Sequence, residues 1–142
     1  MALMYYPKQG EILLCNYNTG CVAPEMTKMR PVVVVSPRLR RRADLVAVVP
    51  LSTTAPKTLE PYHCVIELKT PLPSPFDSPS MWAKCDMIAV IAHSRLDRFK
   101  AGRKAVGGKR TFVSGMLDPD QLRSVRSAVL CGLGFDSLTI HL

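Results

Sequence analysis

Two short apolar runs separated by a basic segment form the strongest pattern in the chain. The first run extends from Pro31 to Pro37 and the second from Leu45 to Leu51, and valine supplies most of both. Short runs of β-branched residues that end at prolines and charges are typical of buried strands. We therefore predict two neighbouring strands, with the positive cluster Arg38, Arg40, Arg41 and Arg42 between them.

The outer ends of these two runs carry the first candidate site. Arg30 precedes the first run, and Ser52 opens the hydroxyl run Ser52 to Thr54 after the second. In an antiparallel hairpin the start of one strand lies beside the end of the other, so Arg30 and Ser52 would emerge at the same end of the sheet. A guanidinium beside a hydroxyl group suits a phosphate. An arginine at a strand edge is also an ordinary surface residue, and Ser and Thr routinely cap turns.

The rest of the chain continues the pattern of short strands and ends in one helix. Turn formers in 18–29 predict a loop, and the proline-rich segment 70–80 predicts an extended surface loop. Asp118 followed by Pro119 predicts a helix start, with a stop at Gly132. We expect further strands at Gly10–Tyr17, Tyr62–Leu68, Trp82–Ala92 and Thr111–Ser114. Six or seven strands and a C-terminal helix suit a mainly β fold, a small, strongly bent antiparallel barrel with the helix packed against it.

Composition limits the classes of protein that fit. The chain has 142 residues, 47% of them apolar, which suits one domain. Its net charge of +8 favours a polyanionic partner such as nucleic acid or an acidic protein. The five cysteines are widely spaced and lack a CxxC pair, which argues against a disulfide framework and a zinc site. Without a leader pattern or an apolar run of roughly 18 residues, we expect a cytosolic protein that does not enter the membrane.

Several blocks, in the right order, make the chain resemble the MazF/PemK family of ribosome-independent mRNA interferases from type II toxin–antitoxin modules. They extend over roughly residues 10 to 97, and are Gly10–Leu14, Lys28–Pro37, Val48–Thr53, Met81–Ile88 and Ser94–Leu96. The resemblance implies an SH3-like barrel, a symmetric homodimer and an acidic antitoxin as partner. It also implies sequence-selective cleavage of single-stranded RNA.

The resemblance also assigns roles to individual residues. Arg30 would be an electrostatic clamp on the phosphorane, and Ser52 stands where the family usually has threonine. Asp86 would be the base for the RNA 2′-hydroxyl, because the run Lys84-Cys85-Asp86 resembles the Arg-Cys-Asp run of PemK-type members. Pro24 stands where some members have a catalytic histidine, so that role does not transfer. The residues expected to contact substrate are Glu25, Lys28, Thr53, Thr54 and Lys84.

The leading hypothesis from the sequence is therefore a metal-independent endoribonuclease that needs no cofactor. Attack by the 2′-hydroxyl would leave a 2′,3′-cyclic phosphate and a 5′-hydroxyl. His63 is a weaker candidate for a catalytic base, because nothing near it in sequence would orient it. The main alternative is a toxin-like module without catalytic activity that binds RNA or inhibits gyrase, and Ser52 and Lys84 are the departures that favour it. A small basic structural protein associated with RNA is the third possibility.

Overall fold

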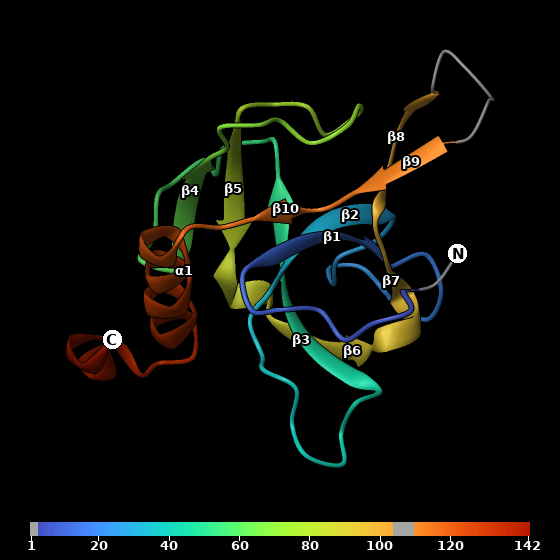
Figure 1. Cartoon of the computed structure of the whole chain (residues 1–142). Coiled ribbons are helices and arrows are strands. Elements are labelled where there is room, and N and C mark those ends of the chain that lie inside the picture. The colour runs from blue at the N-terminus through green and yellow to red at the C-terminus, as the bar shows by residue number, and fades with distance from the viewer. Residues whose placement is uncertain (1–2, 104–109) are drawn as a thin grey trace.

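The computed structural model describes residues 3–103 and 110–142 of the chain. Within these ranges the fold is mainly β, with one α-helix, α1 (Pro119–Gly132), near the C-terminus (Figure 1). Three short 3-10 helices are η1 (Cys85–Met87), η2 (His93–Arg95) and η3 (Asp136–His141). The strands are β1 (Glu11–Asn16), β2 (Met29–Val34), β3 (Leu45–Ser52), β4 (His63–Glu67), β5 (Ser80–Lys84), β6 (Ala89–Ala92), β7 (Leu96–Asp97), β8 (Phe99–Arg103), β9 (Arg110–Val113) and β10 (Gly115–Met116).

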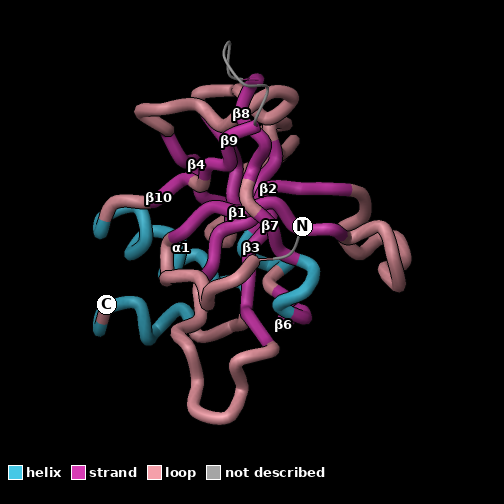
Figure 2. Tube along the Cα trace, turned by 45° about the vertical axis from the view of Figure 1, so that its right-hand side comes forward, coloured by secondary structure: helices cyan, strands magenta, loops and turns pink. Residues whose placement is uncertain are grey.

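Eight of these strands form one antiparallel sheet in the order β10-β1-β2-β3-β5-β4, from which β6 branches at β3 and β7 at β1. The strands β8 and β9 form a separate two-stranded sheet. Both α1 and η3 lie on one flank of the strands (Figure 2). The predicted class, mainly antiparallel β with a C-terminal helix, is confirmed. The count of six or seven strands was too low, because short strands such as β7 and β10 carry too few residues for a visible pattern.

The predicted hairpin is confirmed as β2 and β3. Val32 lies opposite Pro50, and Val34 lies opposite Val48. The connecting loop extends away from the body at the bottom of Figure 1, and its arginines are exposed. Arg30 and Ser52 therefore lie at the other end of the hairpin, where β2 begins and β3 ends.

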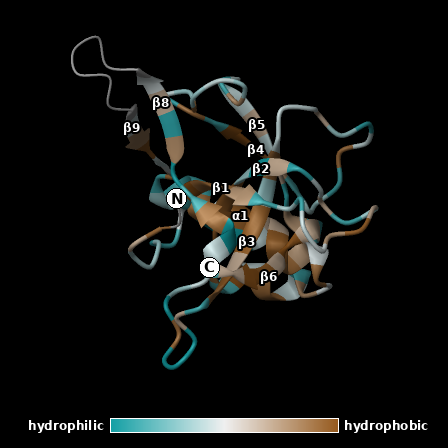
Figure 3. Ribbon diagram, turned by 90° about the vertical axis from the view of Figure 1, so that its right-hand side faces the viewer, coloured by the Kyte–Doolittle hydropathy of each residue, from teal (hydrophilic) through white to brown (hydrophobic). Residues whose placement is uncertain are grey.

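The central strands contribute side chains to two cores, one on each face of the sheet. Ile12, Val33 and Val49 point to the first core, where they meet Val125 and Val129 of α1. We call the opposite face, which points away from α1, the far face. It holds the second core, which includes Leu13, Val32, Val34, Val46, Val48 and Ile91. In Figure 3 the hydrophobic colouring is concentrated on the central strands and the helix beside them.

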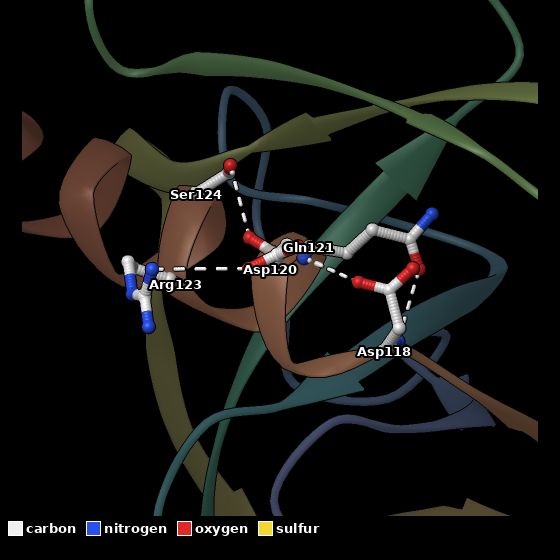
Figure 4. Close-up of polar contacts among 5 residues, drawn as sticks. All are labelled: Asp118, Asp120, Gln121, Arg123 and Ser124. Carbon is white, nitrogen blue, oxygen red and sulfur yellow. Dashed lines mark hydrogen bonds and ion pairs between the residues drawn. The ribbon is translucent and has the colours of Figure 1, made fainter.

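The C-terminal helix begins where the sequence predicts. The side chain of Asp118 accepts a hydrogen bond from the backbone N–H of Gln121, at 2.8 Å (Figure 4). The side chain of Gln121 accepts one from the backbone N–H of Asp118, at 3.0 Å, which completes a capping box. Pro119 occupies the first turn and the helix ends at Gly132. Because α1 packs on β4 and η1, it fixes the end of the sheet beside the candidate site.

One predicted strand, Trp82–Ala92, is interrupted in the structure. The chain forms β5 up to Lys84, turns through η1, and resumes as β6 at Ala89. β5 and β6 both pair with β3, but at different points along it. The turn therefore carries the chain from one part of β3 to another, and Asp86 is not on a strand.

Hydrogen bonding among the described residues leaves the sheet open between its end strands, β4 and β10. A cavity of about 640 Å³ lies in this gap, and Glu67, Leu72 and Met116 are among the residues that line it. Gln121 of α1 spans part of the gap, since its side-chain amide donates a hydrogen bond to the backbone carbonyl of Glu67 at 2.8 Å. The strands thus bend towards a barrel, and a helix and a cavity occupy the place where it would close.

The basic segment 98–110 contains β8 and leads to β9, and these two strands pair antiparallel. Its residues 104–109 lie outside the described part of the chain. None of the helices within residues 3–103 and 110–142 combines the length and the apolar character needed to cross a membrane.

Candidate active site

Arg30 and Ser52 lie at the same end of the β2–β3 hairpin and on the same face of the sheet. The pairing between these strands stops at Val32 and Pro50, and the same register continued by two residues would set Arg30 opposite Ser52. Alternation along each strand puts both residues on the far face, where Val32 belongs to the second core. Both side chains are partly exposed, so the rim of the second core is the point at which this face opens to solvent.

One hydrogen bond to the preceding loop orients the side chain of Arg30. Its Nε donates to the backbone carbonyl of Thr27 at 3.1 Å. Among the described residues, no hydrogen bond or ion pair involves its two terminal nitrogens. The positively charged end of the guanidinium is therefore oriented by the loop while its two NH₂ groups remain available to bind an anion.

Ser52 is the last residue of β3, and its side chain stabilises the turn that follows. Its Oγ accepts a hydrogen bond from the backbone N–H of Thr54 at 3.1 Å. The hydroxyl hydrogen is still available as a donor, which is what a phosphate oxygen requires. Thr53 and Thr54, which follow it, are exposed.

Lys28 and Glu25 lie on the loop that precedes β2. Lys28 has a φ of +73°, and its backbone carbonyl accepts a hydrogen bond from the N–H of Tyr17. Both Lys28 and Glu25 are exposed, but the carboxylate of Glu25 accepts a hydrogen bond from the backbone N–H of Val22 at 2.7 Å. Glu25 thus stabilises the fold of its own loop.

Arg95 holds the start of this loop in place through two hydrogen bonds, a role that the sequence did not predict. Its guanidinium donates to the carbonyl of Asn16 at 2.9 Å and to the carbonyl of Thr19 at 2.8 Å. The residues joined by these bonds are 79 and 76 positions apart in the chain. No local pattern signals such a contact, although Arg95 belongs to one of the blocks on which the family resemblance is based.

The structure separates Asp86 from the pair formed by Arg30 and Ser52. Ser52 pairs with Trp82, whereas Asp86 follows four positions later, beyond the end of β5. Asp86 is exposed, and its backbone packs so closely on α1 that a Cβ added to Gly132 would lie 3.1 Å from the Asp86 Cα. Lys84, the last residue of β5, is partly exposed and pairs with His63 on β4.

Trp82 is the neighbour of Ser52 that the sequence could not identify, because the pairing of β3 with β5 is needed to see it. Trp82 lies opposite Ser52 on one side and opposite Val65 of β4 on the other. We call Arg30, Ser52, Trp82 and Val65 the rim row, since they follow one another across the far face on four adjacent strands.

The cysteine and histidine side chains near the rim row are poorly placed for nucleophilic or base chemistry. Burial raises the pKa of the Cys15 thiol, which lies opposite Arg30 on the neighbouring strand β1, to about 12. Burial likewise raises the pKa of Cys85. His63 accepts a hydrogen bond at Nδ1 from the backbone N–H of Glu60, at 3.0 Å. The buried thiols therefore remain protonated at neutral pH, and His63 serves the turn before β4.

Within residues 3–103 and 110–142, no three His, Cys, Asp or Glu side chains gather into a group that could hold a metal ion. The chemistry that the rim row offers is therefore that of a fixed cation, a hydroxyl donor and an aromatic ring. These three groups match an anionic ligand that also carries a flat ring.

Comparison with known proteins identifies the family. Residues 8–130 match the model for the PemK-like, MazF-like toxin of type II toxin–antitoxin systems. The uncharacterized protein YifN of Escherichia coli (strain K12) is 32% identical over 121 residues, which cover 72% of this chain and 80% of YifN.

Two solved structures share the fold. An endoribonuclease in complex with its cognate antitoxin, from a mycobacterial species, superposes with a TM-score of 0.58 at 20% identity and covers 90% of this chain and 95% of its own. MazF from Deinococcus radiodurans superposes with a TM-score of 0.56 at 20% identity and covers 92% and 98% of the two chains. The extent of the family match shows that this chain belongs to the PemK-like, MazF-like toxins of type II toxin–antitoxin systems.

Proposed function

We propose that this toxin is an endoribonuclease that cuts single-stranded RNA, mRNA among it, without a metal ion. The observation that carries the proposal is the position of Arg30 and Ser52, which share one end of the hairpin, one face of the sheet and access to solvent. A guanidinium with free NH₂ groups and a hydroxyl with a free hydrogen can together hold two oxygens of one phosphate. The chain belongs to this toxin family, and its solved structural neighbours include an endoribonuclease. Both findings support the same proposal.

In the proposed reaction the 2′-oxygen of a ribose attacks the adjacent phosphorus, and the bond from phosphorus to the 5′-oxygen breaks. Arg30 and Ser52 stabilise the negative charge that grows on the phosphorane oxygens. Electrostatic stabilisation of this kind is often the largest single contribution to catalysis. The products are a 2′,3′-cyclic phosphate and a 5′-hydroxyl, whose oxygen takes its proton from water.

Asp86 is the proposed acceptor of the 2′-hydroxyl proton, either directly or through a water bound with the substrate. Its exposure supports this role, whereas its place beyond the end of β5 makes the water-mediated route the better fit. Asp86→Asn should then lower kcat while leaving the affinity for uncleavable RNA unchanged. A wild-type kcat in Asp86→Asn would remove Asp86 from the mechanism.

Exposed groups around the rim row are proposed to bind the rest of the RNA. Lys28 and Lys84 supply positive charge on either side, and Thr53 and Thr54 supply hydroxyl groups. Glu25 would act indirectly, through the loop that it stabilises. Each phosphate neutralised should add about −0.7 to the slope of log affinity against log salt.

We further propose that the toxin acts as a homodimer in the cytoplasm and is neutralised by an acidic antitoxin. The net charge of +8 supports an acidic partner, and a structural neighbour was solved with its cognate antitoxin. Sedimentation of the purified toxin, alone and with the protein encoded beside it, tests the homodimer and the antitoxin complex.

The decisive experiment incubates purified toxin with labelled single-stranded RNA in EDTA and analyses the ends. We expect fragments with 5′-hydroxyl ends, and a loss of about 10²–10³ in kcat for Arg30→Ala. Arg123→Ala is the matched control, because Arg123 is an exposed arginine on α1. Binding without cleavage would favour the inactive RNA-binding module, and inhibition of supercoiling without RNA cleavage would favour gyrase as target.

A further inference from the structure

Trp82 is the only tryptophan of the chain, and nothing in the proposed chemistry requires it. It lies in the middle of the rim row, next to Ser52 on β3 and next to Val65 on β4. Adjacent strands are about 4.8 Å apart. The indole is therefore one strand away from the hydroxyl proposed to hold the scissile phosphate.

The far face of β4 and β5 is open to solvent. Met81, Ala83 and Ile66 point the other way, into the core that α1 covers. On the far face, Val65 is 46% exposed and Trp82 is partly exposed. The exposed side chain of Val65 beside the partly exposed indole of Trp82 gives this face an apolar surface that solvent reaches.

Polar groups surround this surface on two sides. Lys84 and His63 form the neighbouring cross-strand pair towards η1, and both are partly exposed. Ser80 and Glu67 form the pair on the other side, where the Ser80 hydroxyl donates to the Glu67 carboxylate at 2.6 Å. A ligand lying on Trp82 would thus contact an aromatic ring below, hydrogen-bonding groups at its edges and the Arg30–Ser52 phosphate site beside it.

We propose that Trp82 and Val65 form a base-binding surface, on which the base of a nucleotide adjoining the scissile phosphate stacks. This inference rests on the proposed function, since the phosphate held by Arg30 and Ser52 places the nucleotide. Stacking on aromatic side chains is a common and sequence-tolerant way of binding single-stranded nucleic acid. A stacked base would also fix the ribose next to Ser52, so Trp82 would position the substrate as well as bind it.

The single tryptophan makes a direct test possible, because all indole emission of the protein comes from Trp82. The probe is a pool of random-sequence 2′-O-methyl RNA octamers, which cannot be cleaved, titrated into the wild-type protein in EDTA. We expect the octamers to quench Trp82 emission, and an abasic ribose–phosphate octamer to quench it much less. Equal quenching by both, or none by the base-containing octamers, would overturn the inference.

Affinity of the variants, measured by anisotropy of a labelled octamer, gives the second readout. Trp82→Ala should raise Kd by about tenfold or more, whereas Trp82→Phe, which keeps a ring, should stay within about threefold of wild type. Phe135→Ala is the matched control, since Phe135 is a 53%-exposed aromatic residue near the C-terminus. Wild-type affinity of Trp82→Ala, or an equal loss in Phe135→Ala, would contradict the proposal.

The outcomes also separate this inference from the nuclease proposal. Octamer binding with quenching but no cleavage of RNA would sustain the base-binding surface and reject the nuclease. Cleavage of RNA by the wild type, together with unchanged octamer affinity in Trp82→Ala, would support the nuclease and reject the base-binding surface. Acrylamide should quench Trp82 in the free protein, and emission that resists acrylamide would show that the indole is not accessible to a base and would overturn the inference. Emission that changes only when an antitoxin is added would assign the surface to a protein partner instead.

Discussion

Replacing Arg30 with lysine separates the charge of this residue from its shape. Lysine keeps the positive charge but loses the planar fork, and it has no Nε–H to bond the carbonyl of Thr27. In the wild-type protein that bond, at 3.1 Å, orients the guanidinium, and no hydrogen bond or ion pair among the described residues involves its two NH₂ groups. An ammonium group on a flexible stem can reach the same phosphate but can donate only from a single point.

The expected loss follows from the bonds that disappear. A hydrogen bond to a charged group contributes about 1.5–3 kcal/mol. Losing one of two bonds to the phosphorane should therefore lower kcat by roughly 10- to 100-fold, less than the 10²–10³ expected for Arg30→Ala. Because the charge remains, the salt dependence of binding should stay at the wild-type slope, whereas Arg30→Ala should reduce it by about 0.7.

The assay is steady-state cleavage of a labelled single-stranded RNA in EDTA, with kcat and KM determined separately at several salt concentrations. Arg123→Lys is the control, since it makes the same substitution at an exposed site on α1. The reasoning fails if Arg30→Lys keeps the wild-type kcat and only raises KM, because Arg30 would then bind the ground state alone. It also fails if the control loses as much activity.

Three further predictions concern stability and the loop before β2. Asp118→Ala removes the side-chain oxygen that accepts from the N–H of Gln121, while the backbone N–H of residue 118 can still donate to the Gln121 side chain. The change should cost about 1 kcal/mol, lowering Tm by about 3 °C in a thermal melt, whereas Asp120→Ala should lower it by less than half as much. Burial raises the pKa of Cys15 from 9.0 to about 12, so the unfolded state ionises first and the free energy of unfolding should fall as pH rises from 9 to 12. Urea titrations at pH 8 and 10.5 should show a smaller fall in the free energy of unfolding for Cys15→Ala than for the wild type. Equal falls would show that Cys15 is not the source of the pH dependence. Arg95→Ala releases the carbonyls of Asn16 and Thr19, so trypsin should cut after Lys28 about tenfold faster, as followed by mass spectrometry.

The sequence was sufficient for the hairpin and the helix because each depends on local signals. Runs of valine bounded by prolines specify β2 and β3, and Asp118 with Pro119 specifies the start of α1. The break between β5 and β6 was missed because Met81, Ala83 and Cys85 continue the two-residue alternation of buried positions into η1. A 3-10 turn that maintains this alternation gives no signal of its own in the sequence.

The site was only partly accessible to sequence reasoning, for a related reason. Arg30 and Ser52 could be placed together because they flank one hairpin, so their separation depends on a single local pairing. Trp82 and Val65 join them through the pairing of β3 with β5 and of β5 with β4, and these pairings connect segments separated by long loops. Arg95 contacts backbone carbonyls, which any residue type would provide. No pattern of side chains in the sequence could have indicated these strand pairings or the contacts of Arg95.

The two faces of the sheet explain why a binding site can exist at this end of so small a protein. On one face, α1 packs against Ile66, Met81 and Ala83, so β4 and β5 are held in place from behind. On the far face, the second core ends near the level of Arg30, and the side chains of the strands beyond it are partly or fully exposed. The rim row thus lies on strands whose stability comes from the opposite face, and its side chains are free to serve a ligand. Substitutions in the rim row should therefore change binding more than stability, whereas substitutions of the residues behind it should do the reverse.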